Sequence, residues 1–131
     1  MRILVCGGRE YGKVRYEHES VLRAILSLLP SPTDDPDTWL PDCTIIAGGA
    51  TGVDSAARDF AVVNWTGYEE YRADWSKYGR AAGPIRNAEM LAEGRPDVVI
   101  AFPGGRDTAD MVSKARAAGV RVLIYPEDFT V

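Results

Sequence analysis

Short apolar runs alternate along the chain with longer segments whose apolar residues recur every three or four positions. The runs are residues 2–6 (RILVC), 43–47 (CTIIA), 97–102 (DVVIAF) and 121–125 (RVLIY), with a weaker one at 68–73 (YEEYRA). Continuous apolar runs that contain β-branched residues are typical of strands buried on both faces. The pattern therefore predicts five strands, of which the third is weak.

Between these predicted strands, apolar residues recur with the spacing of an α-helix. This spacing predicts helices over residues 14–29, 52–65 and 108–119, and a fourth helix that follows a loop and begins near Pro84. Proline suits a first helical turn, and Gly119 suits the C-terminal cap of the helix before it. This alternation predicts an α/β fold of three layers, with a parallel sheet in the middle and helices on both faces.

The chain shows no internal repeat and no second apolar core pattern, so residues 1–131 are expected to form one domain. Residues 30–42 hold four of the eight prolines together with four aspartates. This composition disfavours regular structure and predicts a flexible surface loop.

The composition is that of a soluble globular domain, with 46% hydrophobic and 26% charged residues. The formal net charge of −4 argues against a protein that coats nucleic acid, which normally carries a basic stripe, so nucleic acid is not an expected partner. The first apolar run is too short for a signal peptide, and no stretch approaches a membrane span. We therefore expect a cytoplasmic protein without membrane association.

Side chains suited to metal or nucleophilic chemistry are few. Cys6 and Cys43 lack CxxC spacing and fall in or beside predicted strands, which favours buried thiols in a reducing compartment over a disulfide or metal site. His18, the only histidine, has helical spacing to Val21 and Leu22, which favours a packing or surface role. No zinc site, Ser-His-Asp triad or Cys-His dyad is supported, and we expect no metal and no cofactor.

Three of the predicted strands end in a pair of glycines: Gly7–Gly8, Gly48–Gly49 and Gly104–Gly105. All strand-to-helix loops of a parallel sheet emerge at one edge, where open α/β sheets bind their ligands. Glycine lets backbone amides approach a ligand closely, and a turn that leads into a helix presents unpaired N–H groups and the positive end of the helix dipole. One such turn has an ordinary steric explanation, but three at one rim favour an anionic, phosphate-bearing small molecule.

Cationic and aromatic side chains lie beside the same turns. Arg9 and Arg106 directly follow glycine pairs, and Arg86 lies at the start of a predicted helix. Arginine suits phosphate because its planar fork donates two parallel charge-assisted hydrogen bonds, although each arginine singly also fits an ordinary surface position. Trp75 and Tyr78 fit two roles equally well: they stack on a nucleobase, or they hold their own loop against the body of the protein.

Four segments together resemble the YspA-like proteins of the SLOG superfamily. The segments are MRILVCGGREYG, AGGATGVDSAA, ADWSKYGRAAGPIRNAEML and DVVIAFPGGRDTADMV, and the match covers most of the chain except residues 14–42. The resemblance implies a Rossmann-like fold, for which we expect the strand order 3-2-1-4-5, and a nucleotide or nucleotide-derived ligand. The expected ligand-binding residues are Gly7, Gly8, Arg9, Gly48, Gly49, Thr51, Gly52, Asp54, Trp75, Tyr78, Arg86, Asn87, Pro103, Gly104, Gly105, Arg106 and Thr108.

The resemblance extends to the Lonely-guy phosphoribohydrolases, which cleave the N-glycosidic bond of nucleoside 5′-monophosphates. Of their PGGxGTxxE motif this chain keeps residues 103–105 and Thr108, and Arg86 is similar to an arginine on their preceding helix. Two departures stand out, because Asp107 replaces a motif glycine and Met111 stands where the catalytic glutamate is expected.

Two functions follow from this resemblance: a module that binds or senses a nucleotide, and a hydrolase of the Lonely-guy type. A hydrolase needs an acid or base near the scissile bond. We nominate Asp110 and Asp54, with Glu89 as a further carboxylate, although Asp110 is about 100° around the helix from Met111. Asp54 also fits a helix-capping pattern with Thr51.

Two further expectations concern partners. The segment ATGVDSAA resembles part of the DNA-processing protein DprA, but an acidic chain lacks the basic face that single-stranded DNA requires, so a DNA-associated role ranks lowest. The apolar character of the first two helices favours a homodimer, as in relatives of this superfamily.

Overall fold

The structure is a computed structural model of the chain and describes residues 1–29 and 42–129. Apart from Asp42, the surface loop expected over residues 30–42 lies outside the described residues.

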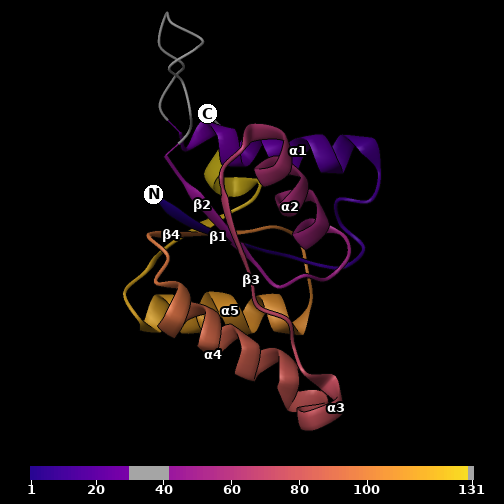
Figure 1. The fold of residues 1–131 in the computed structure, drawn as a ribbon, viewed down its shortest axis with the longest axis vertical. Coiled ribbons are helices and arrows are strands. Elements are labelled where there is room, and N and C mark those ends of the chain that lie inside the picture. The colour runs from indigo at the N-terminus through magenta and orange to yellow at the C-terminus, as the bar shows by residue number, and fades with distance from the viewer. Residues whose placement is uncertain (30–41, 130–131) are drawn as a thin grey trace, which may run out of the picture.

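The described residues form strands and helices in strict alternation over most of the chain (Figure 1). In chain order they are β1 (Arg2–Cys6), α1 (Arg15–Ser27), β2 (Thr44–Ala47), α2 (Val53–Asn64), β3 (Gly67–Glu70), α3 (Trp75–Tyr78), α4 (Ala82–Gly94), β4 (Val98–Ala101), α5 (Arg106–Ala117) and β5 (Arg121–Ile124). Single 3-10 turns, η1 (Gly79–Ala81) and η2 (Glu127–Phe129), precede α4 and follow β5.

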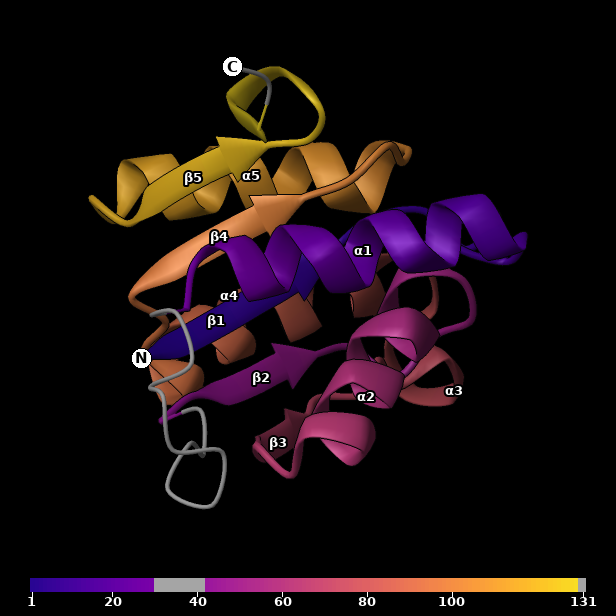
Figure 2. The same cartoon turned by 90° about the horizontal axis from the view of Figure 1, so that it is seen from above.

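The strands form one sheet in the order β3-β2-β1-β4-β5, and every neighbouring pair is parallel. Leu4 in the central strand is in register with Ile46 on one side and Val99 on the other. Figure 2 shows the strand arrows running in the same direction across the sheet. The predicted parallel α/β fold and the strand order 3-2-1-4-5 are confirmed, and the arrangement is Rossmann-like.

Helices cover both faces of the sheet, with α1 and α2 on one face and α4 and α5 on the other (Figure 1). Successive strand residues point to opposite faces, so each strand contributes to two cores. Ile3 and Val5 belong to the core under α1 and α2, whereas Leu4 packs in the core under α4 and α5 with Met90 and Met111. This double burial explains why the strands read as continuous apolar runs rather than as an alternation.

Most element boundaries differ from the sequence-based expectations by one or two residues, and three differences affect the carboxyl edge of the sheet. Strand β3 ends at Glu70, earlier than the expected residue 73, so the chain after Glu70 leaves the sheet at its carboxyl edge. Helix α5 begins at Arg106 rather than at residue 108, directly after the glycine turn. The expected loop before α4 contains the short helix α3, which Asp74 caps by accepting a hydrogen bond from the Lys77 amide at 3.1 Å.

Other local expectations are met. Helix α4 begins at Ala82, so Pro84 lies in its first turn. Gly119 has φ +77 just after α5, in the left-handed region that a C-terminal cap requires. Across the described ranges, no helix combines the length and the apolar character that crossing a membrane would need.

Candidate functional site

The glycine turns after β1, β2 and β4 meet at the carboxyl edge of the sheet, on the side toward which the strand arrows point in Figure 2. Two backbone hydrogen bonds tie them together. The Gly8 amide donates to the Pro103 carbonyl at 2.8 Å, and the Val53 amide, at the start of α2, donates to the Gly8 carbonyl at 3.3 Å. The central turn is thus fixed to both of its neighbours.

These turns surround a cavity of about 540 Å³, which we call the rim cavity. Its lining residues are Gly7, Gly8, Arg9, Gly48, Gly49, Ala50, Thr51, Asp54, Arg72, Ala73, Trp75, Arg86, Gly105, Arg106, Asp107 and Thr108. The volume falls within the usual range for small-molecule sites in proteins.

The glycines of the turns serve different purposes. A Cβ on Gly8 would lie 3.0 Å from the Pro103 carbonyl oxygen, and a Cβ on Gly104 would lie 2.7 Å from the Gly8 amide nitrogen, so close packing between the turns requires both. A Cβ on Gly48 would overlap the Arg86 guanidinium. Gly105 is different, because a Cβ there would meet no atom within 4 Å. Among these four glycines, only Gly105 faces open space at the position where a side chain would begin.

Gly49 and Gly52 have conformational reasons to be glycine. Their φ values are +76 and +73, in the region that side chains rarely adopt. Gly52 packs against the Arg9 carbonyl and is the residue before α2, but it does not line the rim cavity.

Arg86 reaches the cavity from α4 and is half-buried there. Its Nη1 donates to the Gly48 carbonyl at 3.3 Å, and its Nε donates to Asn87 Oδ1 at 3.0 Å. Both acceptors are neutral. Among the ion pairs of the described residues none involves Arg86, although its charge acts on the nearby Asp54 carboxyl and opposes the rise in the pKa of Asp54.

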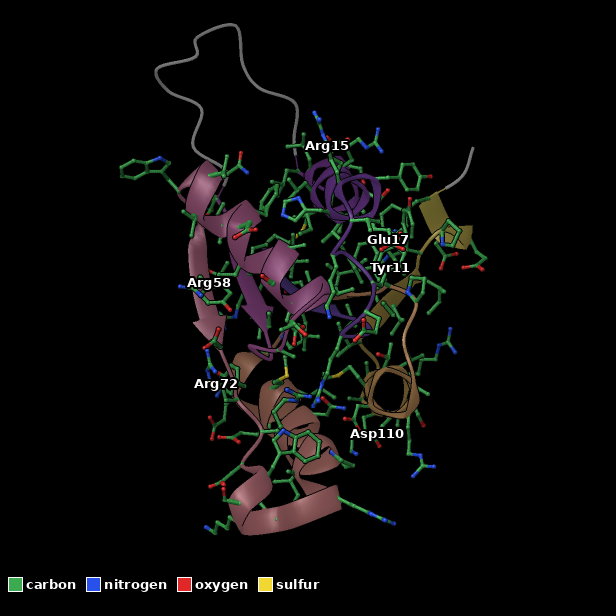
Figure 3. All side chains as sticks on the ribbon, turned by 90° about the vertical axis from the view of Figure 1, so that its right-hand side faces the viewer. Tyr11, Arg15, Glu17, Arg58, Arg72 and Asp110 are labelled. Carbon is green, nitrogen blue, oxygen red and sulfur yellow. The ribbon has the colours of Figure 1, made fainter. Side chains whose placement is uncertain are left out.

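The other cations approach from the cavity mouth. The Arg9 guanidinium lies 5.4 Å from the centre of the Trp75 ring, so the β1 turn and the loop before α4 touch there through a cation–π contact. Arg106 begins α5. Arg72 forms an ion pair with Glu70 at 2.7 Å, and Figure 3 shows it beside the end of β3.

Asp54 is the buried carboxyl of the site, with 8% of its surface exposed. Burial raises its pKa, and the hydrogen bond that Oδ2 accepts from the Ala50 amide at 3.1 Å and the charge of Arg86 oppose this rise without cancelling it. Burial likewise raises the pKa of the neighbouring Cys6 thiol to about 12, with the Asp54 charge adding to the rise. Cys6 is therefore protonated at neutral pH and unsuited to act as a nucleophile.

Asp110 does not reach the cavity. Its carboxylate pairs with Lys114 at 2.6 Å and accepts a hydrogen bond from the Asn87 amide at 3.1 Å, on the α5 side of the molecule in Figure 3. Burial acts to raise its pKa, but these bonds outweigh burial and hold the pKa below its ordinary value. Asn87 also donates to the Asp107 carbonyl at 2.9 Å, so it joins α4 to α5 rather than facing the cavity. Such a carboxylate is poorly suited to be an acid or base.

Several other nominated residues lie outside the rim cavity. Met111 is fully buried in the core, so the position of the expected glutamate serves packing. Glu89 is exposed on α4, and Tyr78 lies next to Lys77, whose Nζ is 5.0 Å from its ring centre. Pro103 and Gly104 face the opposite side of their turn.

Sequence reasoning missed one charged lining residue, Arg72. Its position just after the third strand could have identified Arg72, because the other strand-to-helix turns are expected at the carboxyl edge of the sheet. The apolar pattern predicts a strand that continues to residue 73, which places Arg72 inside the strand rather than at this edge.

The remaining reactive side chains give no further site. Cys6 and Cys43 are free thiols, the second buried and the first partly so. His18 lies within hydrogen-bond distance of Asp59, 2.9 Å from Nε2 to Oδ2, and links α1 to α2. Within residues 1–29 and 42–129, no three or more His, Cys, Asp or Glu side chains gather as a metal ligand set.

Comparison with known proteins gives one informative similarity. No protein-family model matches the chain, and no solved structure matches it. The chain is similar to the Gene 61 protein of Mycobacterium phage D29, with 38% identity over 88 residues that cover 62% of this chain and 70% of that protein. Identity at this level over most of the phage protein means that the chain belongs to the same family as the Gene 61 protein of Mycobacterium phage D29.

Proposed function

We propose that the protein binds a nucleotide or a nucleotide-derived phosphate ligand in the rim cavity, as a binding or sensing module. The observation that carries the proposal is the set of Arg9, Arg86 and Arg106, which line one cavity and make no ion pair with any described residue. Arg86 is half-buried and Arg9 and Arg106 are exposed, so the three arginines present positive charge to one cavity, which Asp54 and Asp107 also line.

The cavity dimensions favour a nucleotide over inorganic phosphate alone. A phosphate group fills only a small part of about 540 Å³. Trp75 lines the same cavity and is 43% exposed, so an aromatic base has a surface on which to stack. In this proposal the phosphate lies near Gly105 and the arginines, and the base lies toward Trp75.

The resemblance to YspA-like SLOG proteins supports the same proposal. Its four segments contribute the β1 turn, the β2 turn with the start of α2, the start of α4 and the β4 turn with the start of α5. Most of the residues that the sequence analysis expects at the ligand line the rim cavity. We therefore propose membership of the SLOG superfamily as well.

Nucleotide hydrolysis of the Lonely-guy type is a second candidate, favoured by Asp54 alone. A buried carboxyl with a raised pKa inside the cavity is the kind of group that donates a proton to a leaving base. The first candidate ranks higher because Asp110 is held by Lys114 and Asn87, and Met111 replaces the expected glutamate.

A cytoplasmic location and a homodimer belong to the proposal too. Free thiols suit a reducing compartment. Val62, Val63 and Trp65 are exposed on and just after α2, which gives a second copy of the chain an apolar surface to cover.

Calorimetric titration with AMP tests the binding proposal, and adenosine is the matched control without phosphate. We expect AMP to bind at least tenfold more tightly than adenosine, because the unpaired arginines act on the phosphate. Equal affinities would remove the arginines from the explanation, and no binding of either would end the proposal.

Chromatography of the same mixtures separates binding from hydrolysis. Release of adenine from AMP that Asp54→Asn abolishes would establish the hydrolase. Stable AMP with measurable binding is the result that we expect.

A further inference from the structure

The segment between β3 and α4 forms one wall of the rim cavity. We call residues 72–81, which contain α3 and η1, the α3 arm. The arm contributes Arg72, Ala73 and Trp75 to the lining of the cavity. Both flanks of the arm are fixed to the body of the protein, because the Tyr71 amide donates to the Ala47 carbonyl at 2.9 Å and Ala82 is buried. The arm therefore lies along the cavity between two fixed points.

Most of the α3 arm is exposed to solvent. Every residue from Asp74 to Ala81 is exposed, and neither α3 nor η1 contains a buried residue. Figure 1 shows α3 at the lower end of the molecule, where it projects at the start of α4. Within the described residues, no ion pair or hydrogen bond joins a side chain of residues 74–81 to a residue outside the arm. A segment with so few buried contacts opens at a low cost in free energy.

A cation–π contact joins the arm to the turn after β1. The Arg9 guanidinium lies 5.4 Å from the centre of the Trp75 ring, and both side chains line the rim cavity. In the proposed function these two side chains bind the phosphate and the base, whereas in the free protein they contact each other. An exposed cation–π contact is weak, so a ligand that binds both side chains can replace it.

Gly79 gives the arm a place to turn. It lies between α3 and α4 with φ +54 and ψ −131, a conformation that residues with a side chain rarely adopt. No atom lies within 4 Å of the position where its Cβ would be, so packing does not fix this residue. Hinges of protein lids are residues of this kind, which lie at the end of an element and absorb a change in φ and ψ.

The charge of the arm favours its approach to an anion. Lys77 and Arg80 are exposed and form no ion pair with a described residue. Asp74 is the only acidic residue in the sequence of the arm, and Arg72 is paired with Glu70 outside it. The arm therefore carries a net positive charge toward a bound phosphate.

We propose that the α3 arm is a lid of the rim cavity that closes on the bound ligand. In the free protein the contact between Arg9 and Trp75 holds the arm beside the cavity. When the ligand binds, its phosphate takes Arg9, its base stacks on Trp75, and the arm turns at Gly79 to cover it. The inference rests on the proposed nucleotide function and adds a conformational step to that function.

Hydrogen exchange of the free protein tests the contact that holds the arm. We expect Arg9→Gln to speed the exchange of the amides of residues 74–81 by about threefold or more, because the arm loses its contact with the β1 turn. Arg106→Gln is the matched control. Arg106 is also exposed and lines the rim cavity, but Arg9 makes the contact with Trp75, so Arg106→Gln should leave this exchange unchanged.

Hydrogen exchange with saturating AMP tests closure. Residues 77–81 do not line the rim cavity, so a ligand that meets a fixed wall protects only the lining residues of the arm. A closing lid extends the protection to residues 77–81, where we expect exchange to slow by about fivefold or more. The turn at residues 118–120 also lies outside the cavity lining and should exchange at the same rate with and without AMP.

Substitution of Gly79 tests the hinge. We expect Gly79→Ala to weaken AMP binding by about fivefold, because alanine rarely adopts the φ of +54 that this position requires. Gly119→Ala is the matched control, since Gly119 has φ +77, is exposed, has no atom within 4 Å of its Cβ position and lines no part of the rim cavity. Its AMP affinity should stay within about twofold of the wild type.

Three results would each overturn the lid while leaving the nucleotide proposal standing. They are unchanged exchange of residues 74–81 in free Arg9→Gln, AMP protection confined to the lining residues of the arm, and equal AMP affinities of Gly79→Ala and Gly119→Ala. Failure of the wild type to bind AMP in calorimetric titration would overturn the nucleotide proposal and, with it, closure on the ligand.

Discussion

Arg2 and Arg86 are both half-buried arginines, and they lie at opposite ends of the sheet. Arg2 donates from Nε to the Gly94 carbonyl at 2.6 Å and from Nη2 to Glu69 at 2.7 Å, so a carboxylate neutralises its charge. Arg86 donates only to a backbone carbonyl and an amide oxygen. A carboxylate neutralises the first arginine within the fold, whereas the second makes no ion pair with a described residue.

The surroundings of the two arginines differ in the same way. At the amino edge of the sheet the Arg2 amide donates to Asp97 at 2.7 Å, and the terminal amine donates to the Asp42 carbonyl at 2.9 Å. At the carboxyl edge Arg9 and Arg106 have no carboxylate partner among the described residues. Arg9 and Arg106 are exposed, so water solvates their charges, whereas Arg86 is half-buried and an unpaired charge there costs more free energy.

Removing each arginine separately gives the sharpest test of this comparison. We expect Arg86→Ala to weaken AMP binding ten- to hundredfold, about 1.4–2.7 kcal/mol, with little change in Tm. We expect Arg2→Ala to leave AMP affinity within about twofold and to lower stability by about 1 kcal/mol, because it removes one ion pair and one hydrogen bond. Calorimetric titration measures the affinities, and thermal unfolding measures the stabilities.

The contrast between Arg2 and Arg86 would be contradicted if Arg2→Ala and Arg86→Ala had the same effects on AMP affinity and stability. Unchanged AMP affinity in Arg86→Ala would mean that its charge serves packing around Gly48. Loss of AMP binding in Arg2→Ala with an intact fold would move the site to the other edge of the sheet.

Gly104 and Gly105, which are adjacent in the turn after β4, offer a second contrast between a packing role and a binding role. A Cβ on Gly104 would meet Thr108 and the Gly8 amide, so we expect Gly104→Ala to lower the free energy of unfolding by about 1–2 kcal/mol. A Cβ on Gly105 would meet no atom of the protein within 4 Å. We therefore expect Gly105→Ala to keep wild-type stability and to weaken AMP binding a few-fold, because the methyl group lies where the phosphate approaches.

Urea unfolding and AMP titration of both variants measure these effects. Equal stability of the two variants would show that the packing between the β1 and β4 turns is looser than the distances indicate. Unchanged AMP affinity in Gly105→Ala would place the phosphate away from the start of α5.

The fold was readable from the sequence because its signals are local. Continuous apolar runs such as residues 2–6 identified buried strands, and the parallel arrangement then assigned all three glycine turns to one edge. The same geometry found most of the rim cavity, including Arg9, Arg86 and Arg106. These inferences need only the chain direction of each strand, not the position of any side chain.

What the sequence could not give depends on contacts between distant segments. The hydrogen bond from Asn87 to Asp110 joins α4 to α5, although the Lys114 pair with Asp110 is local, four residues along α5. The position of Arg72 at the edge of the sheet depends on where β3 ends. No pattern along the chain records these distances.

The smallest expected effect concerns Asp54, the anion beside Arg86. Asp54→Asn keeps an oxygen to accept the Ala50 amide and removes the charge. Burial raises the pKa of Asp54 in the folded protein, so the folded state holds its proton more tightly than the unfolded chain does. The stability that protonated Asp54 contributes is fully present below the ordinary carboxyl pKa. It is lost as the pH rises through the raised pKa that Asp54 has in the folded protein.

We therefore expect Asp54→Asn to have a slightly higher Tm than the wild type at pH 7, with the difference vanishing well below the ordinary carboxyl pKa, where Asp54 is protonated in both states. AMP affinity should rise by less than tenfold, because a carboxylate no longer lies near the phosphate. A lower Tm for Asp54→Asn at pH 7 would mean that the Asp54 charge is stabilised by Arg86 more than burial opposes it. In that case Arg86 would be a structural arginine like Arg2, and the contrast between the two ends of the sheet would disappear.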